Sequence, residues 1–231
     1  MFNKNQRKEV AKNTVDIVQK GSYKKSTKEI PLYTDKNFHS FLIKENEFSQ
    51  LPKNDIRHET KSELIFNKKG VIKTILDYAG EANGKIAVLN FASAKNAGGG
   101  YKNGSMSQEE AIAYCSNLEQ VLSQNKNVYN EFYMYHRKNQ LDFYSSRMIY
   151  TENLSVFKNE QFELLDTPVY VDVITSCAVN VRNLKQQHKM KQVKEAPQIM
   201  EDRIEKVIQL AISQKVDTII LGAFGAGGNK L

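Results

Sequence analysis

The hydrophobic positions along the chain alternate between a helical period and short apolar runs, a pattern that predicts an α/β domain. Helices are predicted over residues 5–20 with Gly21 as the stop, over 67–84 with Asn67 as the cap, over 108–123, and from Pro197 onward. Strands are predicted at residues 64–66, 85–92, 148–150, 169–175 and 217–221. Because helices and strands alternate without an internal repeat or a linker, we expect one domain with a mixed sheet.

Two glycine-rich loops stand out in this pattern. The nearly continuous apolar run at residues 85–92 is typical of a buried central strand, and a glycine-rich loop follows it. A second glycine-rich loop, residues 222–228, follows the strand predicted at 217–221. Ligands of open α/β sheets bind at the carboxyl ends of the strands, so these two loops mark the expected ligand edge.

Composition narrows the class of protein. The 231 residues suit one domain, and 40% hydrophobic content with eleven Phe and eleven Tyr excludes a disordered chain. No apolar run approaches the roughly 18 residues of a membrane helix, and the basic N-terminus lacks a following apolar stretch, so we expect neither a membrane span nor a signal peptide. Cys115 and Cys177 are too few for a disulfide scaffold or a four-ligand zinc site. We therefore expect a cytoplasmic protein with two buried structural thiols.

The charge is basic. Thirty-three Lys and Arg against 26 Asp and Glu give a net charge of +7, which favours anionic partners such as nucleotides, polyphosphates or nucleic acid. A lysine-rich coding bias explains the same balance. The lysines gather only in residues 185–194, a polar stretch that we interpret as a solvated face. No helix-turn-helix or RNA-binding signature accompanies the charge, so we expect no sequence-specific nucleic-acid binding.

The segment most informative about chemistry is a glycine triplet followed by two glutamates. Gly98, Gly99 and Gly100 are followed, after seven residues, by Gln108, Glu109 and Glu110. Adjacent glycines after a strand let the backbone approach a ligand closely and turn N–H groups toward it, which suits a diphosphate or a sugar. A plain turn uses the same residues.

The two glutamates also have two interpretations. Acidic residues favour the first turn of a helix for dipole reasons alone. Adjacent helix positions point about 100° apart, so Glu109 and Glu110 suit different roles, one gripping a ligand hydroxyl and the other donating a proton. Cleavage of a glycosidic bond needs such an acid to protonate the leaving oxygen.

These residues resemble the signature of the poly(ADP-ribose) glycohydrolases. The lead-in over residues 89–96 resembles the compact bacterial branch of that family, and further likeness extends over 7–23, 148–150, 156–157, 173–176 and 221–225. The resemblance implies a macrodomain-like fold, a three-layer α/β/α arrangement with a mixed central sheet. It also implies a single domain over residues 1–231, with residues 1–60 or so as an N-terminal helical extension packed on it.

The resemblance implies hydrolysis of the ribose–ribose O-glycosidic bond of poly(ADP-ribose), or of ADP-ribosylated protein, with release of ADP-ribose and without a metal or cofactor. By the same resemblance, Glu110 would be the general acid and Glu109 would hydrogen-bond the ribose that is cleaved. The other substrate contacts that it implies are Gln108, Gly98, Gly99, Gly100, Asn96 and Ser93, with the backbone of Gly225, Ala226, Gly227 and Gly228 in the second loop.

One departure from the family pattern concerns the second glycine loop. In the family this loop continues through a small residue and an aromatic, then a Gly-Asn stretch and a final helix, whereas residues 225–231 lack the aromatic and stop. We therefore expect a shortened C-terminus with weaker ligand contacts. Two alternatives to the glycohydrolase stay open on this ground: a non-catalytic ADP-ribose-binding module, and a hydrolase of another ADP-ribosyl linkage.

The remaining chemical side chains give weaker signals. Tyr129, Phe132 and Tyr133 fall at near-helical spacing, which favours a core face over a stacking platform for adenine. The four histidines are scattered without metal-ligand spacing.

Overall fold

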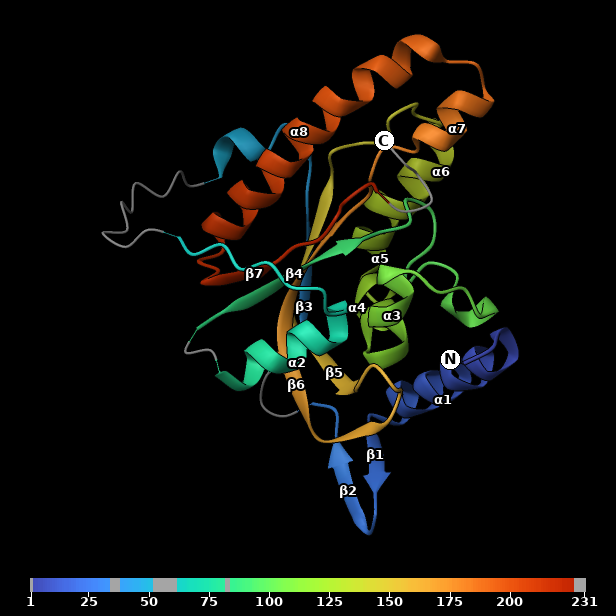
Figure 1. Cartoon of the computed structure of the whole chain (residues 1–231), viewed down its shortest axis with the longest axis vertical. Helices are drawn as coiled ribbons and strands as arrows, with labels where there is room; N and C mark the ends of the chain where they lie inside the picture. The colour runs from blue at the N-terminus through green and yellow to red at the C-terminus, as the bar shows by residue number, and fades with distance from the viewer. Residues whose placement is uncertain (1, 34–37, 52–61, 82–83, 227–231) are drawn as a thin grey trace.

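The computed structural model describes residues 2–33, 38–51, 62–81 and 84–226 (Figure 1). The strands are β1 (Ser22–Lys25), β2 (Lys28–Pro31), β3 (His39–Ile43), β4 (Ile86–Phe91), β5 (Met148–Lys158), β6 (Leu164–Ser176) and β7 (Thr218–Ile220). The longer helices are α1 (Lys4–Lys20), α2 (Val71–Glu81), α3 (Gln108–Cys115), α4 (Leu118–Ser123), α7 (Val181–Gln186) and α8 (Met190–Ser213). Shorter helical segments are η1 (Phe48–Gln50), η2 (Tyr101–Asn103), α5 (Lys126–Tyr129), η3 (Asn130–Met134) and α6 (Tyr135–Asn139).

The central sheet has the strand order β3-β5-β6-β4-β7 and is mixed. Strands β4, β6 and β7 are parallel, whereas β5 runs antiparallel to both β6 and β3. Strand β4 therefore lies between two parallel neighbours, as its apolar run predicted. The parallel arrangement brings the loops that follow β4, β6 and β7 to one edge of the sheet.

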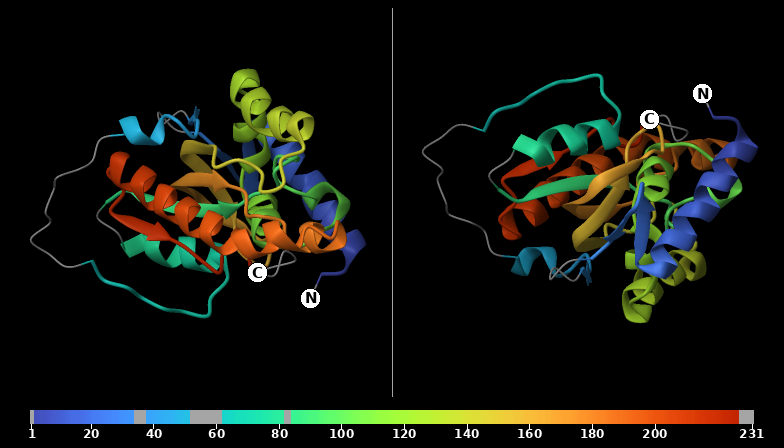
Figure 2. Two further views of the ribbon diagram at one scale, coloured as in Figure 1. Left: turned by 90° about the horizontal axis from the view of Figure 1, so that it is seen from above. Right: turned by 90° about the horizontal axis from the view of Figure 1, so that it is seen from below.

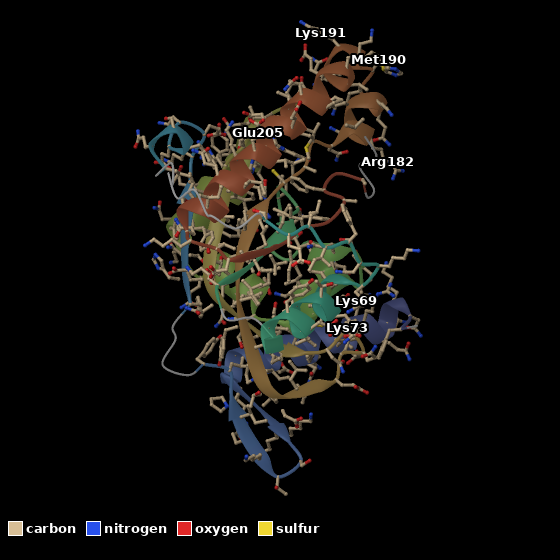
Figure 3. All side chains as sticks on the ribbon, turned by 60° about the vertical axis from the view of Figure 1, so that its left-hand side comes forward. Lys69, Lys73, Arg182, Met190, Lys191 and Glu205 are labelled. Atoms are coloured by element: carbon tan, nitrogen blue, oxygen red, sulfur yellow. The ribbon has the colours of Figure 1, made fainter. Side chains whose placement is uncertain are left out.

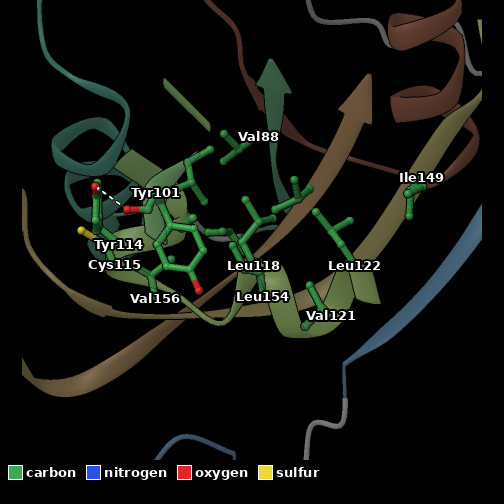
Figure 4. Packing of buried hydrophobic residues seen from close by; sticks show 14 of the residues in the cluster. Val88, Tyr101, Tyr114, Cys115, Leu118, Val121, Leu122, Ile149, Leu154 and Val156 are labelled. Carbon is green, nitrogen blue, oxygen red and sulfur yellow. Dashed lines mark hydrogen bonds between the residues drawn. The ribbon is translucent and has the colours of Figure 1, made fainter. Parts of the chain in front are cut away.

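Helices cover both faces of the sheet, which confirms the three-layer α/β/α fold. Successive side chains of a strand point to opposite faces, so neighbours such as Val88 and Leu89 enter different cores. The first core joins the strands to α2, α3 and α4, and part of it is drawn in Figure 4. The second core joins them to α7 and α8. The view from above in Figure 2 places the strands between α8 and α2.

The N-terminal helix α1 begins and ends as the sequence predicts. The side chain of Asn3 accepts hydrogen bonds from Asn5 N and Gln6 N, each 3.0 Å long, in a capping box. Gly21 has a left-handed φ of +74° and ends the helix by donating to Ile17 O at 2.9 Å. The hairpin β1–β2 then projects from the end of the molecule far from α7 (Figure 1).

The helix predicted over residues 108–123 is broken in the structure, and this prediction was wrong in its length. Ser116 has an extended backbone and forms an isolated bridge with Val156 of β5. Asn117 then donates its N–H to Ser155 O at 3.2 Å and accepts Ser155 N at its side-chain oxygen at 2.9 Å. Pairing with β5 thus replaces helix hydrogen bonds at this point, and the chain continues as α3 and α4.

Three further expectations about secondary structure were wrong. Residues 64–66 form no strand, because Leu64 and Phe66 are 76% and 87% exposed and have no partner strand in the described sheets. Asn67 forms a turn by accepting Lys69 N at 2.9 Å, and helix α2 begins only at Val71. Pro197 lies inside α8, seven residues after its start, because the preceding turns already pack Val193 and Ala196 against the second core.

The basic stretch at residues 185–194 is a solvated surface, as predicted. Three exposed lysines lie around the connection between α7 and α8, namely Lys185, Lys191 and Lys194. Figure 3 shows Arg182 and Lys191 at this end of the molecule. The aromatic segment forms part of the core, also as predicted, because Phe132 and Tyr133 are fully buried. Both thiols, Cys115 and Cys177, are free and buried.

Candidate active site

The loop after β4 requires glycine at two positions. Gly98 and Gly99 have left-handed φ values of +71° and +62°. A Cβ placed on Gly99 would lie 2.4 Å from Glu110 Oε1 and 3.0 Å from Glu109 Oε2. The loop backbone therefore lies directly against both carboxyl groups, and only glycine permits this approach.

Glu109 is held beneath this loop. Its Oε2 accepts the N–H of Ser93 at 2.7 Å, and its Oε1 accepts a long hydrogen bond of 3.4 Å from Asn90 Nδ2. The side chain is 2% exposed. Burial raises the pKa of Glu109 from 4.5 to about 8, although the donors from Ser93 and Asn90 oppose the shift. The buried Glu109 carboxyl therefore keeps its proton to a higher pH than an exposed glutamate does.

Glu110 lies closer to the surface, with 8% of the residue exposed. Its Oε1 accepts the N–H of Gly100 at 2.9 Å, and its Oε2 accepts a short hydrogen bond from Ser107 Oγ. Ser107 is the residue before α3, so both glutamates sit in the first turn of that helix. The third glycine of the triplet and the second glutamate are therefore linked directly.

Gln108 connects α3 to the central strand. Its Nε2 donates to Leu89 O at 2.7 Å, and its Oε1 accepts Phe91 N at 2.9 Å. One side chain thus satisfies two backbone groups of β4, as a paired strand residue would do. The structure gives Gln108 this anchoring contact, which holds the start of α3 at the end of β4.

Ser93 and Asn96 hold the glycine loop in shape. Ser93 Oγ accepts the backbone N–H groups of Lys95 at 3.3 Å and Asn96 at 3.2 Å. Asn96 Oδ1 accepts Arg137 Nη2 at 3.1 Å, and the backbone O of Asn96 accepts Gly99 N at 3.0 Å. Both residues lie within the loop that contacts Glu109 and Glu110, and their contact with a ribose stays a prediction.

A buried tyrosine supports the loop from the core side. The single hydroxyl proton of Tyr114 on α3 is shared between Tyr101 O at 2.8 Å (Figure 4) and Ser105 O at 2.9 Å. Tyr114 is fully buried, and its ring packs edge-on against that of Tyr101 at a centroid distance of 5.6 Å. The segment after the triplet is therefore fixed to the same helix that carries the glutamates.

The second glycine loop meets the site through Phe91. A Cβ on Gly222 would lie 2.9 Å from Phe91 Cζ, and the rings of Phe91 and Phe224 are 5.4 Å apart. Gly225 has a left-handed φ of +87°, and Ala226 N donates to Ala223 O at 3.1 Å. The two last residues predicted for this loop, Gly227 and Gly228, lie outside the described residues.

The sequence alone left three residues of the site unnoticed. Asn90 is fully buried beside Glu109 and is the one polar residue in the apolar run of β4, a signal that was available. Ser107 precedes a predicted helix and is a residue type that favours that position. Arg137, which binds Asn96 from 41 residues away, has no local signal.

Neither a membrane-spanning helix nor a cluster of metal ligands occurs among the described residues. No helix in the described part of the chain is long and apolar enough to cross a membrane. Among the same residues, no three or more His, Cys, Asp or Glu side chains gather as metal ligands would.

A mixed sheet between two helical layers, with a glycine loop and two buried glutamates at its carboxyl edge, defines a macrodomain-like fold. The model of the family described as microbial-type PARG, catalytic domain, matches residues 11–159. The chain therefore belongs to this family of poly(ADP-ribose) glycohydrolases and is an enzyme of the glycosidase class. A comparison with curated proteins gave no significant match.

Solved structures of bacterial glycohydrolases resemble the whole described fold. Poly(ADP-ribose) glycohydrolase from Thermomonospora curvata has a TM-score of 0.87 at 25% identity, over 98% of this chain and 82% of that one. The same enzyme bound to the inhibitor ADP-HPD has a TM-score of 0.84 at 26% identity, with the same coverage. The Deinococcus radiodurans enzyme in complex with ADP-ribose has a TM-score of 0.74 at 25% identity, over 83% of this chain and 76% of that one.

Proposed function

We propose that this chain hydrolyses the ribose–ribose O-glycosidic bond of poly(ADP-ribose) and releases ADP-ribose, with Glu110 as the general acid. The observation that carries the proposal is the placement of the Glu110 carboxyl between Gly100 N and Ser107 Oγ, beside the glycine loop that follows the carboxyl end of β4. Membership of the microbial-type PARG family and the ligands of its solved relatives support the choice of substrate.

The two glutamates take different roles in this mechanism. Glu110 is the more exposed of the pair, at 8% against 2%, so its carboxyl is the one that a leaving oxygen in the site would reach. Protonation of that oxygen by Glu110 lets the C–O bond break with oxocarbenium-like charge on the ribose. A water then adds to the anomeric carbon, and the proton it loses returns to the Glu110 carboxylate. Glu109, fixed by Ser93 and Asn90, hydrogen-bonds a hydroxyl of the ribose that is cleaved.

Backbone groups supply the remaining contacts in the proposal. The triplet at Gly98, Gly99 and Gly100 lines the distal ribose and diphosphate, and the second loop from Gly225 to Gly228 grips the phosphates through N–H groups. Asn96 and Ser93 hold the loop in position for these contacts, and Gln108 holds α3 in position. Gly100 N already donates to Glu110, Gly99 N donates to Asn96 O, and the backbone of Gly98 hydrogen-bonds Glu109, so the second loop must provide the phosphate donors.

The pKa of about 8 at Glu109 makes a direct comparison of the two glutamates necessary. Release of ADP-ribose from purified poly(ADP-ribose) is measured for the native chain, Glu110→Gln and Glu109→Gln. Loss of a general acid lowers turnover by about a hundredfold or more, so Glu110→Gln is expected to do so while binding ADP-ribose normally in calorimetry. Turnover by Glu110→Gln within about tenfold of the native rate would contradict its role.

A cytoplasmic location belongs to the same proposal. Cys115 and Cys177 are both free and buried, as thiols are in a reducing compartment. Fractionation of cells that express the chain tests this location directly.

A further inference from the structure

A pocket of about 340 Å³ lies on the glycine loop, beside the two glutamates, and shares Asn96, Gly99 and Arg137 with the site described above. Its walls come from the loop and η2, with α4, α5 and α6 opposite, and neither Glu109 nor Glu110 lines it. Gly99 does line it, at the position where a Cβ would touch Glu110 Oε1 at 2.4 Å. The pocket and the proposed acid are therefore separated by the backbone of a single glycine.

The pocket has a positive charge that is free to bind a ligand. Lys102 Nζ pairs with Glu119 Oε1 at 2.6 Å, and Tyr101 Oη donates to Glu119 Oε2 at 2.7 Å, so both oxygens of this carboxylate are occupied. Arg137 pairs with no carboxylate within the described ranges; its Nη2 donates to Asn96 Oδ1 at 3.1 Å. The positive charges of Lys102 and Arg137 and the negative charge of Glu119 sum to a net charge of +1. The Arg137 guanidinium has further N–H groups that can donate to a ligand.

An aromatic ring lies in the same pocket. Tyr129 is half-buried and lines the wall, and its ring packs against Tyr133 at a centroid distance of 5.2 Å and an angle of 37°. Tyr133 is fully buried, so Tyr129 is supported from behind while it borders the cavity. A supported aromatic ring beside an unpaired guanidinium is the combination that recognises a base together with its phosphate.

We propose that this pocket binds the adenosine phosphate part of the ADP-ribose unit that leaves when the polymer is cut. This inference rests on the proposed function. In poly(ADP-ribose) the leaving oxygen belongs to an adenosine ribose, so its base and diphosphate lie within a few bonds of Glu110. The volume is near the lower end of the ~300–1,000 Å³ that small-ligand pockets have, which suits a nucleotide.

The test measures binding in the Glu110→Gln chain, so that the polymer survives. The probes are a poly(ADP-ribose) oligomer of defined length and ADP-ribose alone. The oligomer is expected to bind more tightly than ADP-ribose. When Arg137→Gln is added, the affinity for the oligomer is expected to fall about five- to tenfold. The slope of log affinity against log salt concentration is expected to become less steep by about 0.7, which is the effect of losing one phosphate contact. ADP-ribose affinity is expected to fall by a clearly smaller factor than oligomer affinity, because Arg137 also holds Asn96 in the loop.

Matched variants separate the contacts. Lys138→Gln removes an equal charge from the adjacent, exposed position on α6 and is expected to change neither affinity. Arg137→Lys retains the charge and is expected to restore most of the salt slope. Tyr129→Ala is expected to lower the affinity for the oligomer about tenfold because the stacking contact is lost, while Tyr129→Phe keeps native affinity.

Free ADP-ribose carries the same adenosine phosphate chemistry. Two equivalents of ADP-ribose per chain, with the second lost in Arg137→Gln, would support the site and assign it to free nucleotide as well. If Arg137→Gln lowered the affinity for both probes equally, Arg137 would act only through Asn96 and the loop, and the proposal would be overturned. The proposal would also be overturned if the oligomer bound no more tightly than ADP-ribose. This outcome is independent of the turnover assay, which tests the proposed function by the release of ADP-ribose by the native chain.

Discussion

Gly100 donates its backbone N–H to Glu110 Oε1 at 2.9 Å, so the glycine triplet and the glutamate pair form one hydrogen-bonded unit. Ten residues separate the two positions, and the intervening chain passes through η2 and the tight turn at Gly104 before it re-enters α3. The carboxyl of Glu110 therefore has its orientation fixed by the loop that is proposed to hold the substrate. A change in the loop is expected to alter the acid as well as the ligand contacts.

Gly99→Ala is expected to abolish most activity and to lower stability. The new Cβ would lie 2.4 Å from Glu110 Oε1, and alanine at a φ of +62° costs roughly 1–2 kcal/mol. Because displacement of a catalytic group by about 1 Å lowers rates about a hundredfold, ADP-ribose release should fall by at least that factor. Gly70→Ala is the control, since nothing lies within 4 Å of its Cβ. Activity of Gly99→Ala within twofold of the control would refute the expected clash.

The stability of the native chain is expected to fall as the pH rises from about 5 to 8. The pKa of Glu109 is about 8 in the folded state and 4.5 ordinarily, so the folded state holds a proton that the unfolded state releases across this range. The effect is on the order of a few kcal/mol at full burial. Urea unfolding at several pH values should show that the free energy of unfolding depends less on pH in Glu109→Gln than in the native chain. The exposed Glu9→Gln is the control, and identical profiles for both variants would contradict the shift.

Lys158→Met is expected to raise the free energy of unfolding at pH 7. Lys158 is 1% exposed, its Nζ donates to Thr14 Oγ1 at 2.7 Å, and burial lowers its pKa from 10.5 to about 8. At pH 7 the amine is charged in both states, so folding bears the full cost of burying it. Above pH 8 the folded state loses the proton first, and the cost shrinks.

Replacement of a buried charge by an apolar side chain commonly gains about 1–4 kcal/mol, so Lys158→Met should stabilise at pH 7 and less at pH 10. Lys12→Met, at an exposed position of α1, controls for the gain in helix propensity and surface apolarity. Chemical denaturation at the two pH values provides the measurement. A destabilised Lys158→Met at pH 7 would mean that the hydrogen bond to Thr14 outweighs the burial of the charge.

Arg203→Met is expected to lower the free energy of unfolding by about 1–3 kcal/mol, because it leaves buried carbonyls without donors. Arg203 on α8 is 1% exposed and donates to Cys177 O at 2.6 Å and to Phe143 O at 3.1 Å. It thus joins the loop after β6 to the loop before β5. Arg182→Met on exposed α7 should stay within about 0.5 kcal/mol. Equal stability of the two variants would show that the carbonyls find other donors.

Local patterns were sufficient to predict the parts of the fold that position the site. The apolar run of β4, the start of α3 at Gln108 and the two glycine loops follow from side-chain periodicity and from residue types with special backbone freedom. The buried pair Glu109 and Glu110 followed from the motif and its spacing. Each of these signals lies within about twenty residues of sequence.

The features that the sequence did not predict depend on distant contacts. The end of α3 at Ser116 results from its bridge to Val156, forty residues later. Arg137 reaches Asn96, and Arg203 reaches Phe143 and Cys177, without any local pattern that would indicate a partner. The helical start before Pro197 depends on burial of Ala196 against the second core. Burial likewise raises the pKa of Glu109, which no local pattern indicates.

The two hydrogen bonds of Gln108 have a consequence for how the molecule can move. Helix α3 is tied to β4 at Leu89 O and Phe91 N, so it cannot slide along the strand or rotate without breaking both bonds. A polymer that enters the site must then be admitted by rearrangement of the loops, while the helix bearing Glu109 and Glu110 stays fixed to the sheet. Amide hydrogen exchange at Phe91 should accordingly be as slow as in the middle of β4, although Phe91 is the last residue of that strand.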